Sequence, residues 1–356
     1  MNFKNAFFTT FSLLFLFTSC TSEEDLPALD IPLGAYDNGV LILNQGGFGN
    51  GNASISFLSN DLNTFQNTIF SLVNPTITLG DTAQDIGFYL NNAYIVVNGS
   101  NKIEVVNRFT MKHITTIDVG LNNPRYIVFA RGKGYVTNWG NGSSPTDDYV
   151  AVINLNTNAV TSLIPVAEGP ERMAVANDKI YVAHAGGFGF GSTVSIINPV
   201  DNSVSSLNVG DVPNSLEVND GTLYVLCGGK PSWSGTETGG KLSKINLTNN
   251  AVSNLNFAST VHPSNIEIDG TTLYYTIDSD IYKTTTNTAT LPSTSLFSTT
   301  SQGVYGVYSF TVKNDNIYVG DATDYSSDGK VHVYSTSGVL KTSKTVGVIP
   351  AGFYFN

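Results

Sequence analysis

The sequence has 356 residues and a formal net charge of -11 at pH 7, with 41% hydrophobic and only 13% charged residues. Such a chain can bury a large core. Its acidity and its four arginines argue against nucleic acid as a partner, because phosphate binding needs clustered Lys and Arg. Short runs of Val, Ile, Thr, Tyr and Phe alternate with polar residues, which predicts strands and an all-β fold.

The amino terminus carries the pattern of a secretory signal, which we place at residues 1–19. Lys4 supplies a positive charge, and the apolar run 7–17 is too short to cross a bilayer. Thr18 and Ser19, two small residues, stand directly before Cys20, and this resembles a bacterial lipoprotein signal with lipid attached to Cys20. Leu is usual where Phe17 stands, so ordinary signal cleavage nearby is the alternative.

An acidic patch at 22–25 (SEED) follows Cys20 and resembles the surface-export signal of Bacteroidota lipoproteins. The alternative is a solvated start of a linker. Residues 20–37 are therefore expected to hold the lipidated Cys20 and a flexible tether. The expected location is the outer membrane, lipid-anchored and exposed at the cell surface. Lipidation leaves Cys227 without a disulfide partner, and its apolar strand predicts a buried, inert thiol.

From residue 38 onward, one short sequence motif recurs about every 45 residues, and we call it the repeated phrase. It is clearest at 135–138 (YVTN), and the tyrosines that open its copies are separated by 41, 46, 43, 50 and 44 residues. A fixed period of this length indicates a repeat architecture. Four strands separated by turn-forming residues fit in each period, and that is the composition of a propeller blade.

Counting the strands predicts a seven-bladed β-propeller over residues 38–356, with four antiparallel strands per blade. The chain enters its first unit directly at a second strand, and the missing first strand appears as PAGFYF at the carboxyl end. The carboxyl-terminal strand is therefore expected to complete the first blade and close the ring without a bare sheet edge. The repeated motif and its order of strands and turns resemble the YVTN-repeat β-propellers, and that resemblance implies the fold but no particular function.

In a propeller, the first strands line the channel, and the loops that enter them share one face with the loops between second and third strands. The latter loops hold most of the unusual sequence, including both tryptophans of the chain. This asymmetry predicts that this face carries the function. Glycine-flanked aromatics on these loops are candidates for holding a flat ligand or a protein, or they pack as lids: Phe48, Trp139, Phe188, Phe190, Trp233 and Tyr325.

Polar residues at the entries of the first strands are the second group of candidates. Arg125, Arg172, Asn214 and Asn265 follow or lie close to a proline at corresponding points of four units, and Gln84 and Tyr308 are their counterparts. Arginine donors suit carboxylate, phosphate or amide oxygens. The alternative is that the arginines bridge blades through Glu168, Glu171 or Glu217. His184, at the end of a second strand, is included as a hydrogen-bonding candidate.

The sequence shows no signal for catalysis. It has no nucleophile elbow and no phosphate-cradling loop, and no clustered His, Cys and carboxylates form a metal site. A calcium site on the Asp-rich loops, at Asp147 and Asp148 or at Asp321, Asp324 and Asp328, is a minor alternative. We therefore expect a binding protein with no catalytic residues and no cofactor.

The export signal, the repeat pattern and the chain length together resemble those of the Bacteroidota surface lipoproteins that capture corrinoids such as vitamin B12 (cobalamin). The resemblance implies ligand transfer to a TonB-dependent outer-membrane transporter, and it includes no ligand motif that can be carried over residue by residue. The expected function is capture of a small ligand, with a corrinoid as the best specific candidate. The alternatives are a glycan or siderophore binder and a protein-interaction or adhesin propeller.

Overall fold

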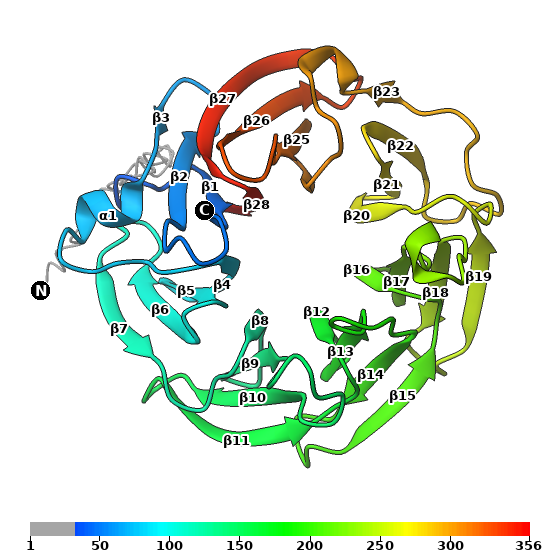
Figure 1. Cartoon of the computed structure of the whole chain (residues 1–356), viewed down its shortest axis with the longest axis horizontal. Helices are drawn as coiled ribbons and strands as arrows, with labels where there is room; N and C mark the ends of the chain where they lie inside the picture. The colour runs from blue at the N-terminus through cyan, green and yellow to red at the C-terminus, as the bar shows by residue number, and fades with distance from the viewer. Residues whose placement is uncertain (1–32) are drawn as a thin grey trace, which may run out of the picture. The chain divides into compact units, whose positions relative to one another are not determined.

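The structure is a computed structural model and describes residues 33–356, so the predicted signal peptide, Cys20 and most of the predicted tether lie outside it. The described residues form seven four-stranded antiparallel sheets arranged as a ring (Figure 1). This confirms the predicted seven-bladed propeller. No helix in the described range is long and apolar enough to cross a membrane.

Each blade contributes one strand to each of four concentric positions. The inner strands are β28 (Pro350–Phe355), β4 (Ala83–Tyr89), β8 (Pro124–Ala130), β12 (Pro170–Ala176), β16 (Pro213–Asn219), β20 (Ser264–Asp269) and β24 (Ser309–Lys313). The second strands are β1 (Gly39–Asn44), β5 (Asn92–Val97), β9 (Lys133–Asn138), β13 (Lys179–His184), β17 (Thr222–Cys227), β21 (Thr272–Ile277) and β25 (Asn316–Asp321).

The third strands are β2 (Ser54–Ser59), β6 (Lys102–Asn107), β10 (Tyr149–Asn154), β14 (Thr193–Ile197), β18 (Lys241–Asn246), β22 (Asp280–Thr285) and β26 (Asp328–Ser335). The outer strands are β3 (Phe65–Gln66), β7 (His113–Ile117), β11 (Ala159–Pro165), β15 (Val204–Asn208), β19 (Val252–Asn256), β23 (Phe297–Ser298) and β27 (Leu340–Val348). Three short helices lie between strands: α1 (Ile69–Val73), η1 (Ser232–Ser234) and η2 (Thr300–Gln302).

The second strands are the most buried part of each blade, because both of their faces pack against neighbouring sheets. The six tyrosines of the repeated phrase are at most 6% exposed. Tyr94 shows the reason: its ring lies 5.2 Å from that of Phe129 in the next blade, and its hydroxyl donates to Asn158 Oδ1 at 2.9 Å. Burying one such side chain stabilises the fold by about 1.5–3 kcal/mol. The repeated phrase therefore marks the core between blades.

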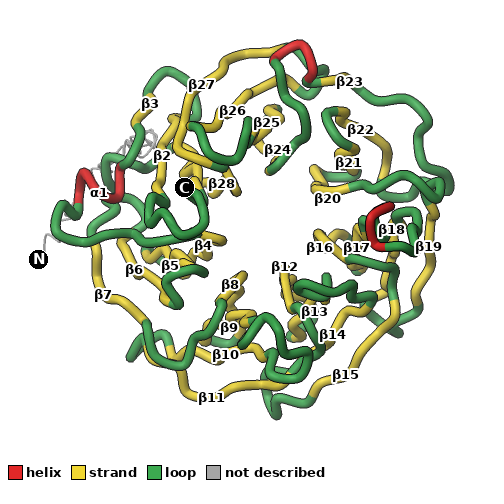
Figure 2. The backbone as a smooth tube through the Cα atoms, viewed as in Figure 1, coloured by secondary structure: helices red, strands yellow, loops and turns green. Residues whose placement is uncertain are grey.

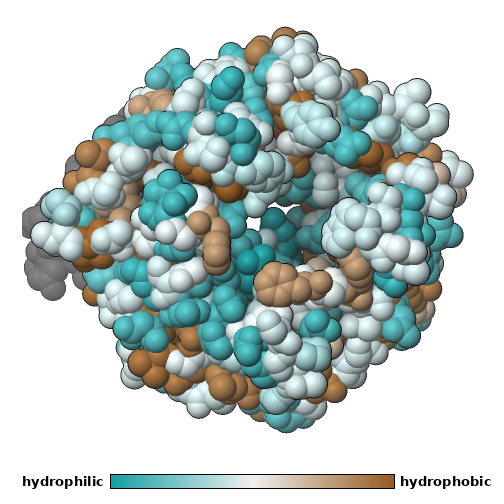
Figure 3. All heavy atoms as spheres, viewed as in Figure 1, coloured by the Kyte–Doolittle hydropathy of each residue, from teal (hydrophilic) through white to brown (hydrophobic). Residues whose placement is uncertain are grey.

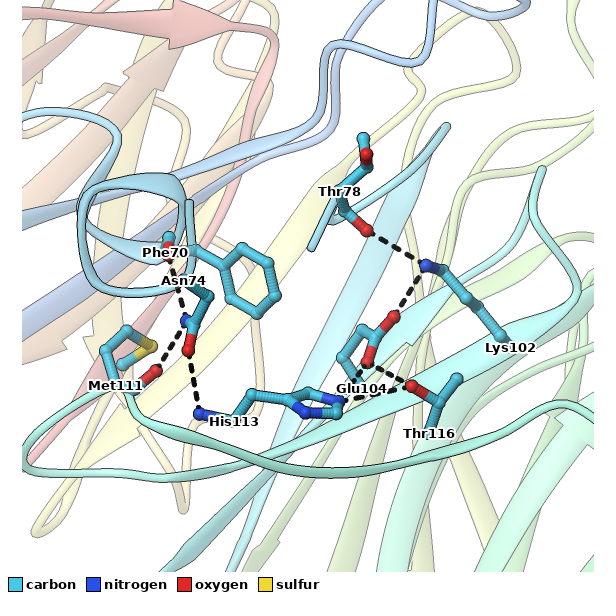
Figure 4. A network of polar contacts seen from close by, with 8 residues as sticks. All are labelled: Phe70, Asn74, Thr78, Lys102, Glu104, Met111, His113 and Thr116. Carbon is cyan, nitrogen blue, oxygen red and sulfur yellow. Dashed lines mark hydrogen bonds and ion pairs between the residues drawn. The ribbon is translucent and has the colours of Figure 1, made fainter. Parts of the chain in front are cut away.

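A buried polar network fastens the segment between β3 and β4, which carries α1, to the second blade (Figure 4). Glu104 is 1% exposed, and its carboxylate lies 2.5 Å from Lys102 Nζ and 2.9 Å from His113 Nε2. Lys102 also donates to the Thr78 carbonyl at 3.0 Å, and Asn74 Oδ1 accepts from the His113 amide at 2.9 Å. These partners satisfy a carboxylate that would otherwise be costly to bury.

The inner strands begin with an irregularity that shapes the channel. Against the second strand, the register shifts at the entry of six of the seven inner strands, all except β24. Such bulges insert an extra residue and re-aim side chains. The residues between the shifted pairs are Gln84, Arg125, Tyr126, Glu171, Arg172, Asn214, Asn265, Ile266 and Ala351.

The residue before the inner strand has a left-handed backbone in five blades. Three of these residues are β-branched, namely Thr82, Val212 and Ile349, each with φ of 56°. This conformation is strained for β-branched residues and persists only where surrounding contacts enforce it. In each of these three cases, the carbonyl of the residue accepts a 2.8 Å hydrogen bond from the amide that follows the second strand of the same blade. The bond fixes the entry of the inner strand.

The ring is closed as expected, because β28 pairs with β1 and completes the first blade. Arg108 fastens this join: its Nη2 donates to the Phe355 carbonyl at 2.9 Å and its Nε to Asn356 Oδ1 at 2.7 Å. Its guanidinium also lies 3.6 Å from the Phe88 ring centroid. Asn356 in turn donates to the carbonyl of Tyr36, which is 6% exposed. Packing therefore begins before residue 38, inside the predicted tether.

We expect Arg108→Ala to lower the free energy of unfolding by about 2–4 kcal/mol, because two hydrogen bonds and a cation–π contact at the join are lost. Urea unfolding measures this. The control is Arg131→Ala, which removes an ion pair to Asp178 whose side chains are 48% and 72% exposed. That change should stay within about 0.5 kcal/mol. Equal losses in the two variants would show that Arg108 does not fasten the ring.

Candidate functional site

The two faces of the ring differ in the length of their loops. Six turns between an inner and a second strand have two residues each. The loops on the other face, between second and third strands, have six or more residues in five blades, and the longest carries η1 (Figure 2). We call this side the loop face. Loops on a rigid scaffold are where binding residues concentrate.

Four of the predicted aromatics form two paired contacts along the loops of three consecutive blades. The rings of Trp139 and Phe188 lie 5.8 Å apart, edge to face, and those of Phe190 and Trp233 lie 5.5 Å apart. Phe188 and Phe190 stand two residues apart in one loop and so link the two pairs along the chain; we call the four residues the aromatic arc. Phe188 and Trp233 are each 79% exposed. The arc therefore presents apolar ring surface to solvent.

The other predicted aromatics lie on other parts of the loop face. Tyr325 is 60% exposed and packs edge to face against Tyr308, with 5.8 Å between the rings. Phe48 is 85% exposed on the first blade. Tyr305, on the loop that enters β24, is 93% exposed and was not among the predicted residues. Its glycine-flanked context, GVYGVY, is the same signal that identified the others.

The polar residues predicted at the strand entries converge on one cavity of about 200 Å³, which we call the channel mouth. Figure 3 shows polar side chains around the central opening of the ring and apolar ones beside it. The bulges explain this convergence, since every lining residue except Ser264 and Tyr308 lies in one. The lining residues are Gln84, Arg125, Tyr126, Arg172, Asn214, Ser264, Asn265, Tyr308 and Ala351.

Arg125 connects the channel mouth to the aromatic arc. Its Nε lies 3.0 Å from Glu171 Oε1 of the next blade, and its guanidinium lies 4.2 Å from the Trp139 ring centroid. The Trp139 indole donates to the Pro170 carbonyl at 3.2 Å. Burial raises the pKa of Glu171, and Arg125 opposes that rise. Arg125 therefore bridges two blades through Glu171, the structural alternative in the sequence prediction.

Arg172 behaves differently, because its guanidinium has no carboxylate partner within 4.0 Å in the described residues. It lies 4.8 Å from the Tyr126 ring centroid. Tyr126, Tyr354, Asp85 and Glu267 all raise its pKa, so it stays charged wherever the protein is folded. A charged, unpaired donor group thus faces the channel mouth.

Three further predicted residues have structural partners. Asn214 and Asn265 line the mouth, yet their amide nitrogens donate to the carbonyls of Pro263 and Val307 at 2.9 and 3.2 Å. His184 is 1% exposed and hydrogen-bonds Ser195 through Nε2 at 2.8 Å. Burial lowers its pKa to about 4, so it is neutral and lies beneath the surface. Cys227 is buried as predicted, and burial raises its pKa to about 12.

Acidic groups lie around Arg172. Burial raises the pKa of Glu217 to about 7, and burial together with Glu217 raises that of Glu267 to about 8. Asp85, which the sequence prediction missed, accepts from the Tyr354 hydroxyl at 2.8 Å and the Ile127 amide at 2.9 Å. Between residues 33 and 356, no three His, Cys, Asp or Glu side chains are grouped to hold a metal ion.

Residues 38–356 match the family described as a domain of unknown function, DUF5074. The chain belongs to the DUF5074 family. No curated protein sequence matches it significantly.

Several solved structures share the fold of this DUF5074 propeller at low sequence identity. A quinonprotein alcohol dehydrogenase-like protein from Bacteroides thetaiotaomicron has a TM-score of 0.69 and 15% identity over 90% of this chain and 78% of that one. A functionally unknown protein from Desulfotomaculum acetoxidans has a TM-score of 0.65 and 15% identity over 89% and 98%. Virginiamycin B lyase from Staphylococcus aureus has a TM-score of 0.57 and 12% identity over 77% and 88%. These likenesses establish the propeller fold alone.

Asp148 is a buried acid beneath the arc of this DUF5074 propeller. It is 3% exposed, its Oδ2 has no hydrogen-bond partner, and it lines a small crevice with Trp139 and Glu168. Burial raises its pKa to about 6, with Asp147 and Glu168 contributing. The folded state therefore holds a proton at pH values where the unfolded chain has released it. The resulting stabilisation is lost as pH rises from about 4 to 6.

We expect Asp148→Asn to raise the free energy of unfolding by about 1–3 kcal/mol at pH 8, because no buried charge then forms. At pH 4 the variant should gain almost nothing, since Asp148 is already protonated in the folded state. Urea unfolding at the two pH values measures the difference. Asp118→Asn, at an exposed position directly after β7, is the control and should lack this pH dependence. A gain of equal size at both pH values would contradict the assignment.

Proposed function

We propose that this chain captures a small, flat, polar-edged ligand on the loop face, and that a corrinoid is the best specific candidate. The observation that carries this proposal is the aromatic arc beside the channel mouth. Exposed rings such as Phe188 and Trp233 contribute flat apolar surface, and the bulged strand entries contribute donors and acceptors. Because these groups stand on a rigid ring, little conformational entropy is lost when a ligand binds.

A corrinoid has the chemistry that these two parts of the site would recognise. Its macrocycle is a broad, nearly flat surface that can pack on the aromatic arc. Its edge carries carboxamide arms, which suit the amide, hydroxyl and guanidinium groups of the channel mouth. Glycans and siderophores also stack on aromatic rings, so they remain the alternatives within small-ligand capture. Binding, with no catalytic step, is the activity that we propose.

A protein partner is a second candidate function, favoured by the exposed aromatics outside the arc. Tyr305, Tyr325 and Phe48 lie on loops of the sixth-to-seventh connection, the seventh blade and the first blade. Exposed Tyr, Phe and Trp are typical of interface hot spots. We propose that the partner is a TonB-dependent outer-membrane transporter that receives the ligand, with this chain held at the membrane by lipid on Cys20.

Titration calorimetry with cobinamide and cobalamin tests the corrinoid proposal directly. We expect saturable binding, and we expect the Phe188→Ala, Trp233→Ala double change to weaken it about tenfold or more, because each lost stacking surface is worth about 1–3 kcal/mol. Both side chains are largely exposed, so the melting temperature should stay unchanged.

Val200→Ala is the matched control, because it removes a 69% exposed apolar side chain from the turn between β14 and β15. Its corrinoid affinity should equal that of the parent chain. Absence of heat with both corrinoids at micromolar protein would rule out the corrinoid. Binding to an oligosaccharide panel under the same conditions would then support the glycan alternative.

Cys20→Ser tests the proposed anchor. We expect the variant to lose incorporation of labelled palmitate and to leave the membrane fraction, because its thiol is the only attachment point for lipid in the predicted signal. Cys227→Ser is the control and should keep both properties.

Surface exposure is tested separately: protease added to intact cells should remove the parent protein. Protection of the lipidated protein in intact cells would contradict exposure.

A further inference from the structure

Arg172 is the one arginine of the chain whose guanidinium has no ion pair or hydrogen bond in the described residues. Arg108 binds the carboxyl-terminal residues, Arg125 pairs with Glu171, and Arg131 pairs with Asp178. Arg172 instead lies against the face of Tyr126 and lines the channel mouth. Its N–H groups are therefore available to an acceptor on a ligand.

The same cavity contains an acceptor that lacks a donor. Gln84 is 8% exposed; its Nε2 donates to the Tyr126 hydroxyl at 3.0 Å, while its Oε1 is buried without a partner. A buried carbonyl oxygen left unpaired is unfavourable, because it has lost its hydrogen bonds to water and gained none in the protein. Gln84 thus contacts the hydroxyl of Tyr126, and Arg172 lies over the ring of the same tyrosine. Gln84 Oε1 lacks a donor, and the Arg172 guanidinium lacks an acceptor.

The charges around Arg172 argue against a full anion as the missing group. Asp85, Glu217 and Glu267 lie near enough to Arg172 to interact with it electrostatically. An incoming carboxylate or phosphate would gain one unpaired arginine, but it would leave Gln84 Oε1 without a donor and would be repelled by whichever of these acids is ionised. A cation would be repelled by Arg172 itself. A neutral group that accepts a hydrogen bond from Arg172 and donates one to Gln84 Oε1 avoids charge repulsion of either sign.

We propose that the channel mouth is a carboxamide site, in which Arg172 donates to the carbonyl oxygen of a ligand carboxamide and Gln84 Oε1 accepts from its NH₂ group. The cavity of about 200 Å³ accommodates one such arm. This inference rests on the proposed function, because the carboxamide is then an arm at the corrinoid edge while the macrocycle packs on the aromatic arc. It assigns the orientation of the ligand, with one edge in the mouth.

Propionamide is the probe that isolates this site from the rest of the corrinoid. With only four arginines in the chain, the Nε–Hε resonances in a nitrogen–proton correlation spectrum are few. We expect propionamide to shift that of Arg172 saturably in the parent protein. Acetate, inorganic phosphate and glycerol should bind more weakly, because none of them offers both a planar carbonyl acceptor and an N–H donor.

Two variants test the two hydrogen bonds. Arg172→Met should weaken propionamide binding about tenfold or more, and Gln84→Leu should weaken propionamide while leaving acetate unchanged. Arg131→Met is the control and should bind as the parent does. The proposal is overturned if propionamide leaves the Arg172 resonance unshifted, or if acetate, phosphate or glycerol binds as tightly. Saturable propionamide binding without cobinamide binding would reject the corrinoid alone and leave the carboxamide site standing.

Discussion

Closure of the ring is the constraint on which the rest of this structure depends. Each sheet is covered on both faces by its neighbours, so no blade can bury its second strand unless the blades on either side are in place. The pairing of β28 with β1, fastened by Arg108, supplies the last of these contacts. Closure also removes free edges at the join, because β28 pairs with β1 along its length.

The same constraint creates the candidate site. Seven inner strands meet around the channel, and the bulges at six entries place mostly polar residues at its mouth. The strained backbone at Thr82, Val212 and Ile349 lies at these same strand entries, and the carbonyls of these residues fix the entry of the inner strand. Ring geometry and binding chemistry are therefore set by the same residues.

The sequence predicts the repeated parts of this fold and misses the local ones. The count of strands indicates seven blades, because every copy meets the same packing requirement, and the first strand displaced to the carboxyl end indicates the closure. Comparing equivalent positions also groups Gln84, Arg172 and Tyr308, which do line one cavity. Contacts between blades are not encoded in any single repeat. They determine the burial of His184, the pairing of Arg125 with Glu171 and the place of Asp85.

The pairing of Arg125 has a consequence for the kind of ligand that fits. Because Arg125 is neutralised by Glu171 and stacked on Trp139, it strengthens the scaffold beneath the arc and adds little free charge to the loop face. Arg172 keeps its charge, while burial raises the pKa values of Glu217 and Glu267 beside it. In the proposed site, Arg172 meets a neutral carboxamide, and the other contacts are ring surfaces and uncharged donors and acceptors, which are only weakly screened by salt. Such a site would select by shape and hydrogen-bond pattern, which suits the proposed capture of a large neutral ligand from a saline medium.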